Sequence, residues 1–124
     1  MCVNPDQNFL GTLTDKEYDV ERENLEIIKK HISKFNDFLP NQKMIERLQQ
    51  ALDSGQKISG ADASFYFHEL KEAELMEQGY DWYTSYPMAV AHYGVSPYSL
   101  YHPEVIRAYP EEFNRNWMKA WRIE

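Results

Sequence analysis

The chain has 124 residues, of which 43% are apolar and 15% aromatic, and its formal net charge is −7, from 20 acidic and 13 basic residues. This length and this content of core-forming residues predict one folded domain and exclude a disordered chain. The acidic balance opposes simple electrostatic attraction to nucleic acid or anionic lipid. The single cysteine, Cys2, excludes an internal disulfide and favours a cytoplasmic site of action.

The sequence lacks the signals of membrane insertion and of export. No apolar run approaches the roughly 20 residues that a membrane-spanning helix needs. The first residues lack the basic and then apolar layout of a signal peptide. We therefore expect a soluble domain without a membrane partner, and its export would require delivery as part of a larger secreted protein.

The first predicted helix follows a flexible N-terminal segment over residues 1–13. Thr14 and Glu17 have the spacing of a capping box. Apolar residues then recur at helical spacing along a charged segment, which predicts an amphipathic helix over residues 15–35. His31 lies among the charged residues of this segment and is expected on the surface.

The second and third predicted helices have clearer limits. An apolar stripe begins after Pro40 and stops at Gly55, which predicts a short second helix. Ser59 with Asp62 resembles another N-terminal cap. The segment that follows contains no proline or glycine after its first turn until Gly79, a typical C-terminal stop.

The last third of the chain is rich in aromatic residues and prolines. Pro87 suits the first turn of a helix that Gly94 closes, and Pro103 and Pro110 each suit a first helical turn. A final apolar stripe consists of Phe113, Trp117, Ala120 and Trp121. Runs of alternating β-branched residues are missing, so we predict an all-α fold, a small orthogonal bundle of five to six short helices in one domain over residues 14–124.

The third helix contains the one concentrated candidate site, the segment HELKE at residues 68–72. On a helical wheel its apolar residues occupy two sides, which is typical of a helix at the centre of a bundle. His68 and Glu72 lie one turn apart between these two sides. Glu69 projects about 100° away from His68 and is not expected to share its pocket.

Three interpretations of His68 and Glu72 remain open. Glu72 could orient a structural core histidine. The pair could instead perform general acid and base catalysis, with Glu72 fixing the tautomer of His68. The third interpretation is a metal site completed by His92 or His102, but HELKE replaces the second histidine of the HExxH zinc signature by glutamate, so a metal is the least favoured.

Other candidate site residues lie around a turn in the C-terminal region. His102 directly precedes Pro103, at a predicted helix start where side chains commonly face a cleft. Tyr98 and Tyr101 flank the same turn and could contact a substrate. The only basic patch consists of Arg107, Arg115, Lys119 and Arg122, and it could bind phosphate.

Two segments, HELKE and SLYHPEVI, resemble the C-terminal toxin-like domains of bacterial polymorphic toxins. Such domains end large proteins of the Rhs, filamentous haemagglutinin, LXG and phage head-associated types. The resemblance covers residues 57–123. It implies an effector that acts on a rival cell and is blocked in its producer by an immunity protein, with a nuclease as the commonest activity. The site positions that it implies are His68, Glu69, Glu72 and His102.

The sequence thus supports the hypothesis of a hydrolytic effector domain, with RNA or DNA as the first-choice substrate and without a metal or cofactor. His68 would be the general acid or base, oriented by Glu72, while His102 and Arg107 would stabilise developing charge. The alternative is a non-catalytic interaction module, such as an immunity-like or phage structural domain, for which acidity is natural. A metal-dependent hydrolase such as a peptidase is the third hypothesis.

Overall fold

The computed structural model describes residues 9–123. Cys2 and the other residues of segment 1–8 lie outside this part of the chain. The described residues form six α-helices, α2 (Arg22–Ile32), α3 (Leu39–Ser54), α4 (Gly60–Glu77), α5 (Trp82–Tyr93), α6 (Pro103–Ala108) and α7 (Arg115–Ala120). They also form three short 3₁₀ helices, η1 (Gly11–Leu13), η2 (Pro97–Ser99) and η3 (Pro110–Glu112). The described residues form no strand beyond one isolated β-bridge, which confirms the predicted all-α bundle. No helix among them is long and apolar enough to cross a membrane.

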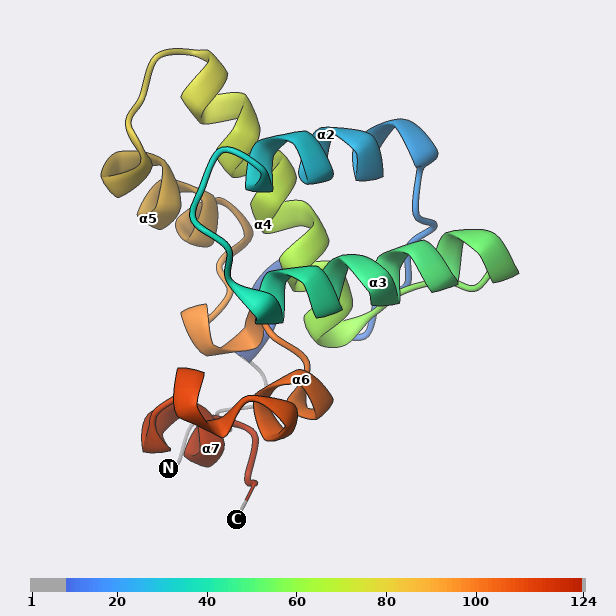
Figure 1. The fold of residues 1–124 in the computed structure, drawn as a ribbon, viewed down its shortest axis with the longest axis vertical. Coiled ribbons are helices and arrows are strands. Elements are labelled where there is room, and N and C mark those ends of the chain that lie inside the picture. Colours follow the sequence, from blue (N-terminus) through green and yellow to red (C-terminus); the bar gives the residue numbers. More distant parts are fainter. Residues whose placement is uncertain (1–8, 124) are drawn as a thin grey trace.

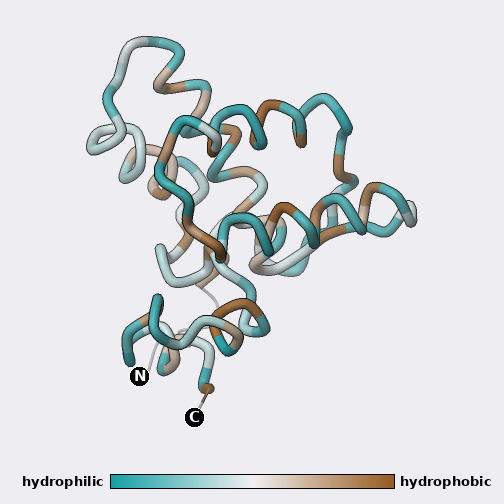
Figure 2. Tube along the Cα trace, in the orientation of Figure 1, coloured by the Kyte–Doolittle hydropathy of each residue, from teal (hydrophilic) through white to brown (hydrophobic). Residues whose placement is uncertain are grey.

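Helix α4 lies at the centre of the bundle, as its two apolar sides predict. It packs against α2, α3 and α5, and it crosses behind α2 and α3 in the view of Figure 1. The apolar residues of α2 and α3 alternate with polar ones along each helix (Figure 2), as expected for helices with one buried face. The largest side chains of the core that are almost completely buried include Tyr66, Phe65, Leu25, Ile28, Met44, Leu48 and Ile106.

The predicted helix over residues 15–35 is wrong in its first half, because α2 begins only at Arg22. The backbone of Tyr18 pairs instead with that of Ile58, through N–H to carbonyl hydrogen bonds of 2.9 and 2.7 Å. Asp15 has a φ of 58°, which ends any helical path at that position. The helical periodicity of the local sequence is therefore overridden here by a backbone pairing with a residue 40 positions away.

Residues 9–13 contact the C-terminal end of α5 and Trp121, which follows α7. Leu13 is buried, the ring of Phe9 meets Trp121 edge-on, and the Phe9 carbonyl accepts a hydrogen bond from the Ser96 amide. The Thr14 hydroxyl donates to the Gly11 carbonyl, so it does not make the predicted capping box. The described part of the predicted flexible segment, residues 9–13, is thus attached to the body of the domain.

The limits of α3 and α4 agree closely with the prediction. Gly55 follows α3 in the left-handed conformation, with a φ of 70°. Ser59 occupies the N-cap position of α4, but its side chain makes no capping hydrogen bond. Asp62 binds Arg47 of α3 instead, so the carboxylate that resembles part of a cap links two helices.

Helix α5 begins earlier than predicted. Asp81 caps it by accepting a hydrogen bond of 2.8 Å from the Thr84 amide, and the first helical residue is Trp82. Pro87 therefore lies inside the helix and not in its first turn. Gly94 ends α5 in the left-handed conformation, as predicted.

The expected proline positions in the C-terminal region are confirmed. Pro103 occupies the first position of α6, and Pro110 occupies that of η3. Of the final apolar stripe only Trp117 and Ala120 lie in α7, while Phe113 precedes it and Trp121 follows it; Asn114 caps the helix by accepting a hydrogen bond from the Asn116 amide.

Among the ion pairs outside the core, we expect those of the Arg47 guanidinium to contribute most to stability. It donates two hydrogen bonds to Asp62, of 2.8 and 2.9 Å, and one of 3.0 Å to Glu104 of α6. Because Arg47 retains 28% exposure, solvent screens these pairs, and Arg47→Ala should cost only about 1 kcal/mol of unfolding free energy in urea titrations. The exposed pair of Lys43 and Glu46 gives the matched control, since Lys43→Ala should leave the unfolding free energy nearly unchanged. Equal losses in the two variants would contradict the bridging role of Arg47.

Candidate functional site

The HELKE segment of α4 faces a cavity of about 400 Å³ that opens to solvent. His68, Glu69 and Glu72 line this cavity from α4. Its other walls are largely aromatic, and the complete set of lining residues from other segments is Ile32, Phe35, Asn36, Phe38, Asn41, Trp82, Tyr86, Leu100, Tyr101 and Trp117. Mostly apolar and aromatic walls with a few polar groups are the usual composition of a small-molecule site.

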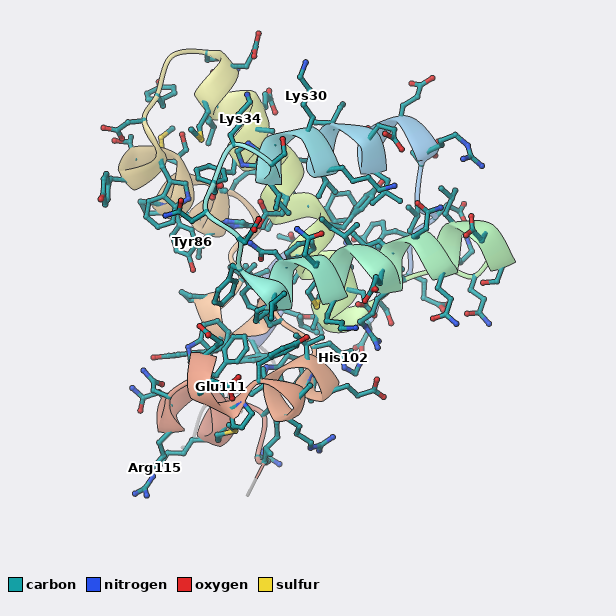
Figure 3. All side chains as sticks on the ribbon, in the orientation of Figure 1. Lys30, Lys34, Tyr86, His102, Glu111 and Arg115 are labelled. Carbon is teal, nitrogen blue, oxygen red and sulfur yellow. The ribbon has the colours of Figure 1, made fainter. Side chains whose placement is uncertain are left out.

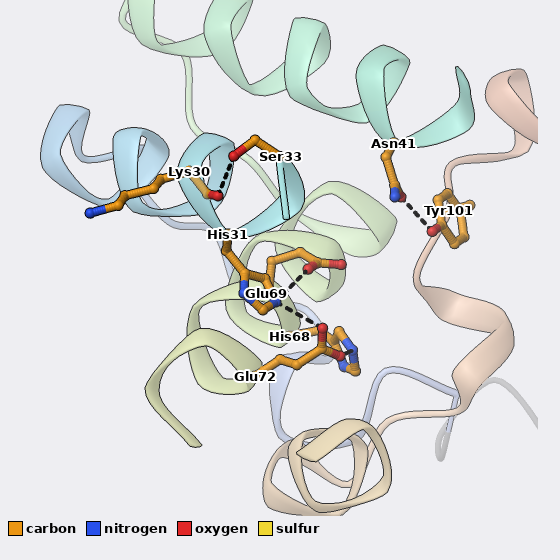
Figure 4. Close-up of polar contacts among 8 residues, drawn as sticks. All are labelled: Lys30, His31, Ser33, Asn41, His68, Glu69, Glu72 and Tyr101. Carbon is orange, nitrogen blue, oxygen red and sulfur yellow. Dashed lines mark hydrogen bonds and ion pairs between the residues drawn. The ribbon is translucent and has the colours of Figure 1, made fainter. Parts of the chain in front are cut away.

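The carboxylate of Glu72 connects two imidazoles, those of His31 and His68. Its Oε1 lies 2.8 Å from Nε2 of His31, and its Oε2 lies 3.0 Å from Nε2 of His68. Each of the three side chains is at most 3% exposed. Figure 4 shows His31 reaching from α2 to the carboxylate, with His68 on its other side. The predicted pairing of His68 with Glu72 is present, and it is one half of a larger network.

The expectation that His31 lies on the surface is wrong. Its side chain is 2% exposed, although its sequence neighbour Lys30 of α2 and Lys34, in the turn that follows α2, both point outward (Figure 3). His31 follows the buried Ile28 by three residues, so it falls on the apolar face of the helix. That spacing is the one signal in the sequence that indicates an inward position.

The expectation that Glu69 lies apart from His68 is also wrong. Both residues line the same cavity, and Oε2 of Glu69 is 3.7 Å from Nε2 of His31. Glu69 is 8% exposed and makes no hydrogen bond to the described residues. A glutamate has three rotatable bonds, so its carboxylate can swing across the helix surface toward a neighbouring group.

The hydrogen bonds assign the tautomers of both histidines. Glu72 accepts at both of its oxygens, so each Nε2 carries the proton. Nδ1 of His31 and Nδ1 of His68 are buried without a hydrogen-bond partner. A proton on either Nδ1 would have no acceptor among the described residues, so in this arrangement each ring donates to Glu72 through Nε2.

The two glutamates of the site have opposite pKa shifts. Burial raises the pKa of Glu69 well above its ordinary value, and the nearby charge of Glu72 raises it further. Burial also acts to raise the pKa of Glu72, but the hydrogen bonds from His31 and His68 outweigh it and hold that pKa below its ordinary value. Glu72 is therefore the ionised carboxylate of the pair.

The structure places His102 elsewhere. It is the N-cap of α6, where its Nδ1 accepts a hydrogen bond of 3.1 Å from the Glu104 amide. Partial burial, together with the positive charge of Arg47, lowers its pKa. His102 does not line the cavity, and Figure 3 shows it at the α6 end of the molecule.

The other predicted substrate contacts are divided between two places. Tyr101 lines the cavity and donates a hydrogen bond of 2.6 Å to Oδ1 of Asn41 (Figure 4). Tyr98 is half-buried against Trp117, outside the lining. Arg107 is exposed on α6 and does not line the cavity either.

Three side chains of the site could hold a metal ion. Ligand atoms of His31, Glu69 and Glu72 all lie within 4.8 Å of one another. The metal interpretation of the sequence places its remaining ligands at His92 or His102, but His92 is exposed near the end of α5 and His102 caps α6. The structure supplies His31 in their place.

Comparisons with protein-family models, with curated proteins and with solved structures give no match to this chain. The basis for a functional interpretation is therefore the geometry and chemistry of the site itself.

Proposed function

We infer that the domain is a hydrolytic effector of the polymorphic toxin type, with RNA or DNA as its first-choice substrate. One observation carries this proposal. The His68 and Glu72 pair, although each side chain is at most 3% exposed, lines an open cavity with aromatic walls, and a pair that serves packing alone needs no such cavity. A buried proton-transfer pair at the base of an accessible cavity is the arrangement that acid and base catalysis requires.

Each member of the network has a distinct task in this proposal. Nε2 of His68 already donates its proton to Oε2 of Glu72, 3.0 Å away, so a proton taken up by the pair is accepted at Nδ1 of His68 and the carboxylate stabilises the resulting imidazolium. His31 positions Glu72 by binding its other oxygen and does not line the cavity. Glu69 is more exposed than the other three residues, so its carboxyl group meets the substrate first.

The cavity walls favour a substrate that contains nucleobases. Trp82, Tyr86, Tyr101 and Trp117 offer ring faces and edges, and stacking on aromatic rings is a common way to bind an unpaired base. Trp117 belongs to α7, which also carries the exposed Arg115 and Lys119 (Figure 3 shows Arg115 pointing outward). Cations beside an aromatic wall can contact phosphate locally, although the whole chain is acidic.

His102 and Arg107 take no part in this mechanism. Neither lines the cavity, and His102 already accepts a capping hydrogen bond.

Expression in a bacterium tests the proposal. The unmodified domain should arrest growth and degrade cellular RNA or DNA, while His68→Ala and Glu72→Ala should lose activity by roughly 10²-fold or more, as expected for a general acid or base. His92→Ala is the matched control, because this exposed histidine of α5 lies outside the cavity. Glu69→Gln nearly preserves the shape of the side chain, so this variant should stay folded. A loss of activity in it would therefore report a catalytic defect and not misfolding.

Two results would overturn the proposal. If the unmodified domain and all variants were equally harmless and left nucleic acid intact, the non-catalytic interaction module would be the better description. If the His68 and Glu72 variants were as active as the His92 variant, the catalytic machinery would lie elsewhere.

A further inference from the structure

We propose that His31, Glu69 and Glu72 form a binding site for one divalent transition-metal ion, with Zn²⁺ as the best-fitting ion. The site uses one ligand from α2 and two from α4, so it connects the two helices through the wall of the cavity. This inference goes beyond the proposed hydrolytic function, because metal binding needs no substrate.

The spacing of the ligand atoms is close to that of a bound tetrahedral ion. Ligand bonds of about 2.1 Å in a tetrahedron separate neighbouring ligand atoms by about 3.4 Å. Nε2 of His31 lies 2.8 Å from Glu72 Oε1 and 3.7 Å from Glu69 Oε2, and all three groups fall within 4.8 Å. Binding an ion here displaces the proton from Nε2 of His31, so the ring takes its Nδ1–H tautomer, and small side-chain rotations then bring the three ligand atoms around the ion.

The environment of Glu69 indicates that the cluster binds a ligand and is not only a structural network. This carboxyl group is about nine-tenths buried and directed into the cavity, yet it makes no hydrogen bond among the described residues. Buried carboxyl groups normally have partners, and an unpaired one is costly. A cation beside His31 and Glu72 would supply the missing partner.

The chemistry of the three ligands selects the kind of ion. One imidazole and two carboxylates without a thiolate suit Zn²⁺ or another first-row ion better than Cu⁺, and the imidazole disfavours Mg²⁺ and Ca²⁺. Three protein ligands leave a fourth position for water or substrate, as in catalytic zinc sites. The cavity next to Glu69 has room for that position.

His68 has a supporting role in this site. Its Nε2 binds the second oxygen of Glu72, and metal-ligating carboxylates are commonly fixed by such hydrogen bonds. His68 is thus a positioning residue for the metal and remains the proton-transfer partner of the proposed reaction.

Calorimetric titration of the chelator-treated chain with Zn²⁺ tests the site. Cys2→Ser is the background for every variant, because a thiol is an alternative zinc ligand. We expect one Zn²⁺ per chain, at least about tenfold weaker binding in Glu69→Gln and in His31→Gln, and unchanged binding in the exposed control His92→Ala. Titration with Co²⁺ should give visible absorption bands that Glu69→Gln removes.

Glu69→Gln is the decisive variant because it removes a ligand without removing a hydrogen bond of the described structure. Its unfolding in the presence of chelator should match that of the parent chain, so that lost binding reports a lost ligand. His31→Gln keeps an N–H donor for Glu72 and gives the same test from α2.

The metal site would be overturned if the parent bound no Zn²⁺, if Glu69→Gln and His31→Gln bound it as tightly as the parent, or if His92→Ala removed the binding. The readout is separate from hydrolysis. A chain that binds Zn²⁺ but harms no cell contradicts only the proposed function, whereas an active chain that binds no metal overturns only this site.

Discussion

Replacing Glu72 by alanine is expected to lower the free energy of unfolding by about 3 kcal/mol, the size of loss that follows when one partner of a buried polar pair is removed. Glu72 is the only acceptor, among the described residues, for the Nε2 protons of His31 and His68. Without it both imidazoles become buried donors with no partner, and a cavity replaces the carboxylate. Urea unfolding at neutral pH measures the loss.

Glu74 provides the matched control on the same helix. Its side chain is 56% exposed, and it makes only a 3.3 Å contact with Lys71. Glu74→Ala should therefore change the free energy by less than about 0.5 kcal/mol. A double-mutant cycle of Glu72→Ala with His31→Ala should show strong coupling, because the two variants remove the same hydrogen bond. Additive losses would contradict the network.

The stability loss also separates two of the three interpretations of the pair that the sequence leaves open, the structural and the catalytic one. A structural pair predicts a less stable domain whose remaining folded fraction behaves normally. A catalytic pair predicts that folded His68→Ala protein is inactive at temperatures well below its unfolding. Because the proposed function gives the same side chains a structural and a catalytic role, activity must be compared per folded molecule and not per total protein.

The sequence predicts the central helix and its limits because their signals are local. The apolar stripe of α3 stops at Gly55, and α4 has an apolar pattern on two sides that only a surrounded helix needs. The pairing of His68 with Glu72 follows from the same pattern, since residues four apart share one helical face.

The rest of the site could not be predicted because it depends on contacts between helices. His31 enters the network only because α2 packs on α4, and its charged neighbours in the sequence indicate the opposite. The position of Glu69 escapes prediction because a helical wheel fixes the direction of a Cβ atom and not the end of a long side chain. The start of α2 could not be predicted because it depends on the pairing of Tyr18 with Ile58, a contact that no local pattern contains.

Tyr66 of α4 explains where α2 starts, and its replacement should have the largest effect in the core. The side chain is 1% exposed, and its hydroxyl oxygen accepts hydrogen bonds of 3.0 Å from the Glu21 amide and from Nδ2 of Asn24. Glu21 is the N-cap residue of α2, and its side chain makes no capping hydrogen bond. The hydroxyl of Tyr66 thus satisfies the first free N–H of the helix from outside it.

A two-step series separates the ring of Tyr66 from its hydroxyl. Tyr66→Ala should cost about 4 kcal/mol, as for other buried aromatic residues, and Tyr66→Phe about 1 kcal/mol for the lost acceptor. Tyr83→Ala is the control, since that ring is 81% exposed and should cost less than about 0.5 kcal/mol. Amide hydrogen exchange should accelerate at Glu21 in Tyr66→Phe. Unchanged exchange there would mean that α2 begins at Arg22 for a reason within its own sequence, and that the pairing of Tyr18 with Ile58 alone sets the boundary.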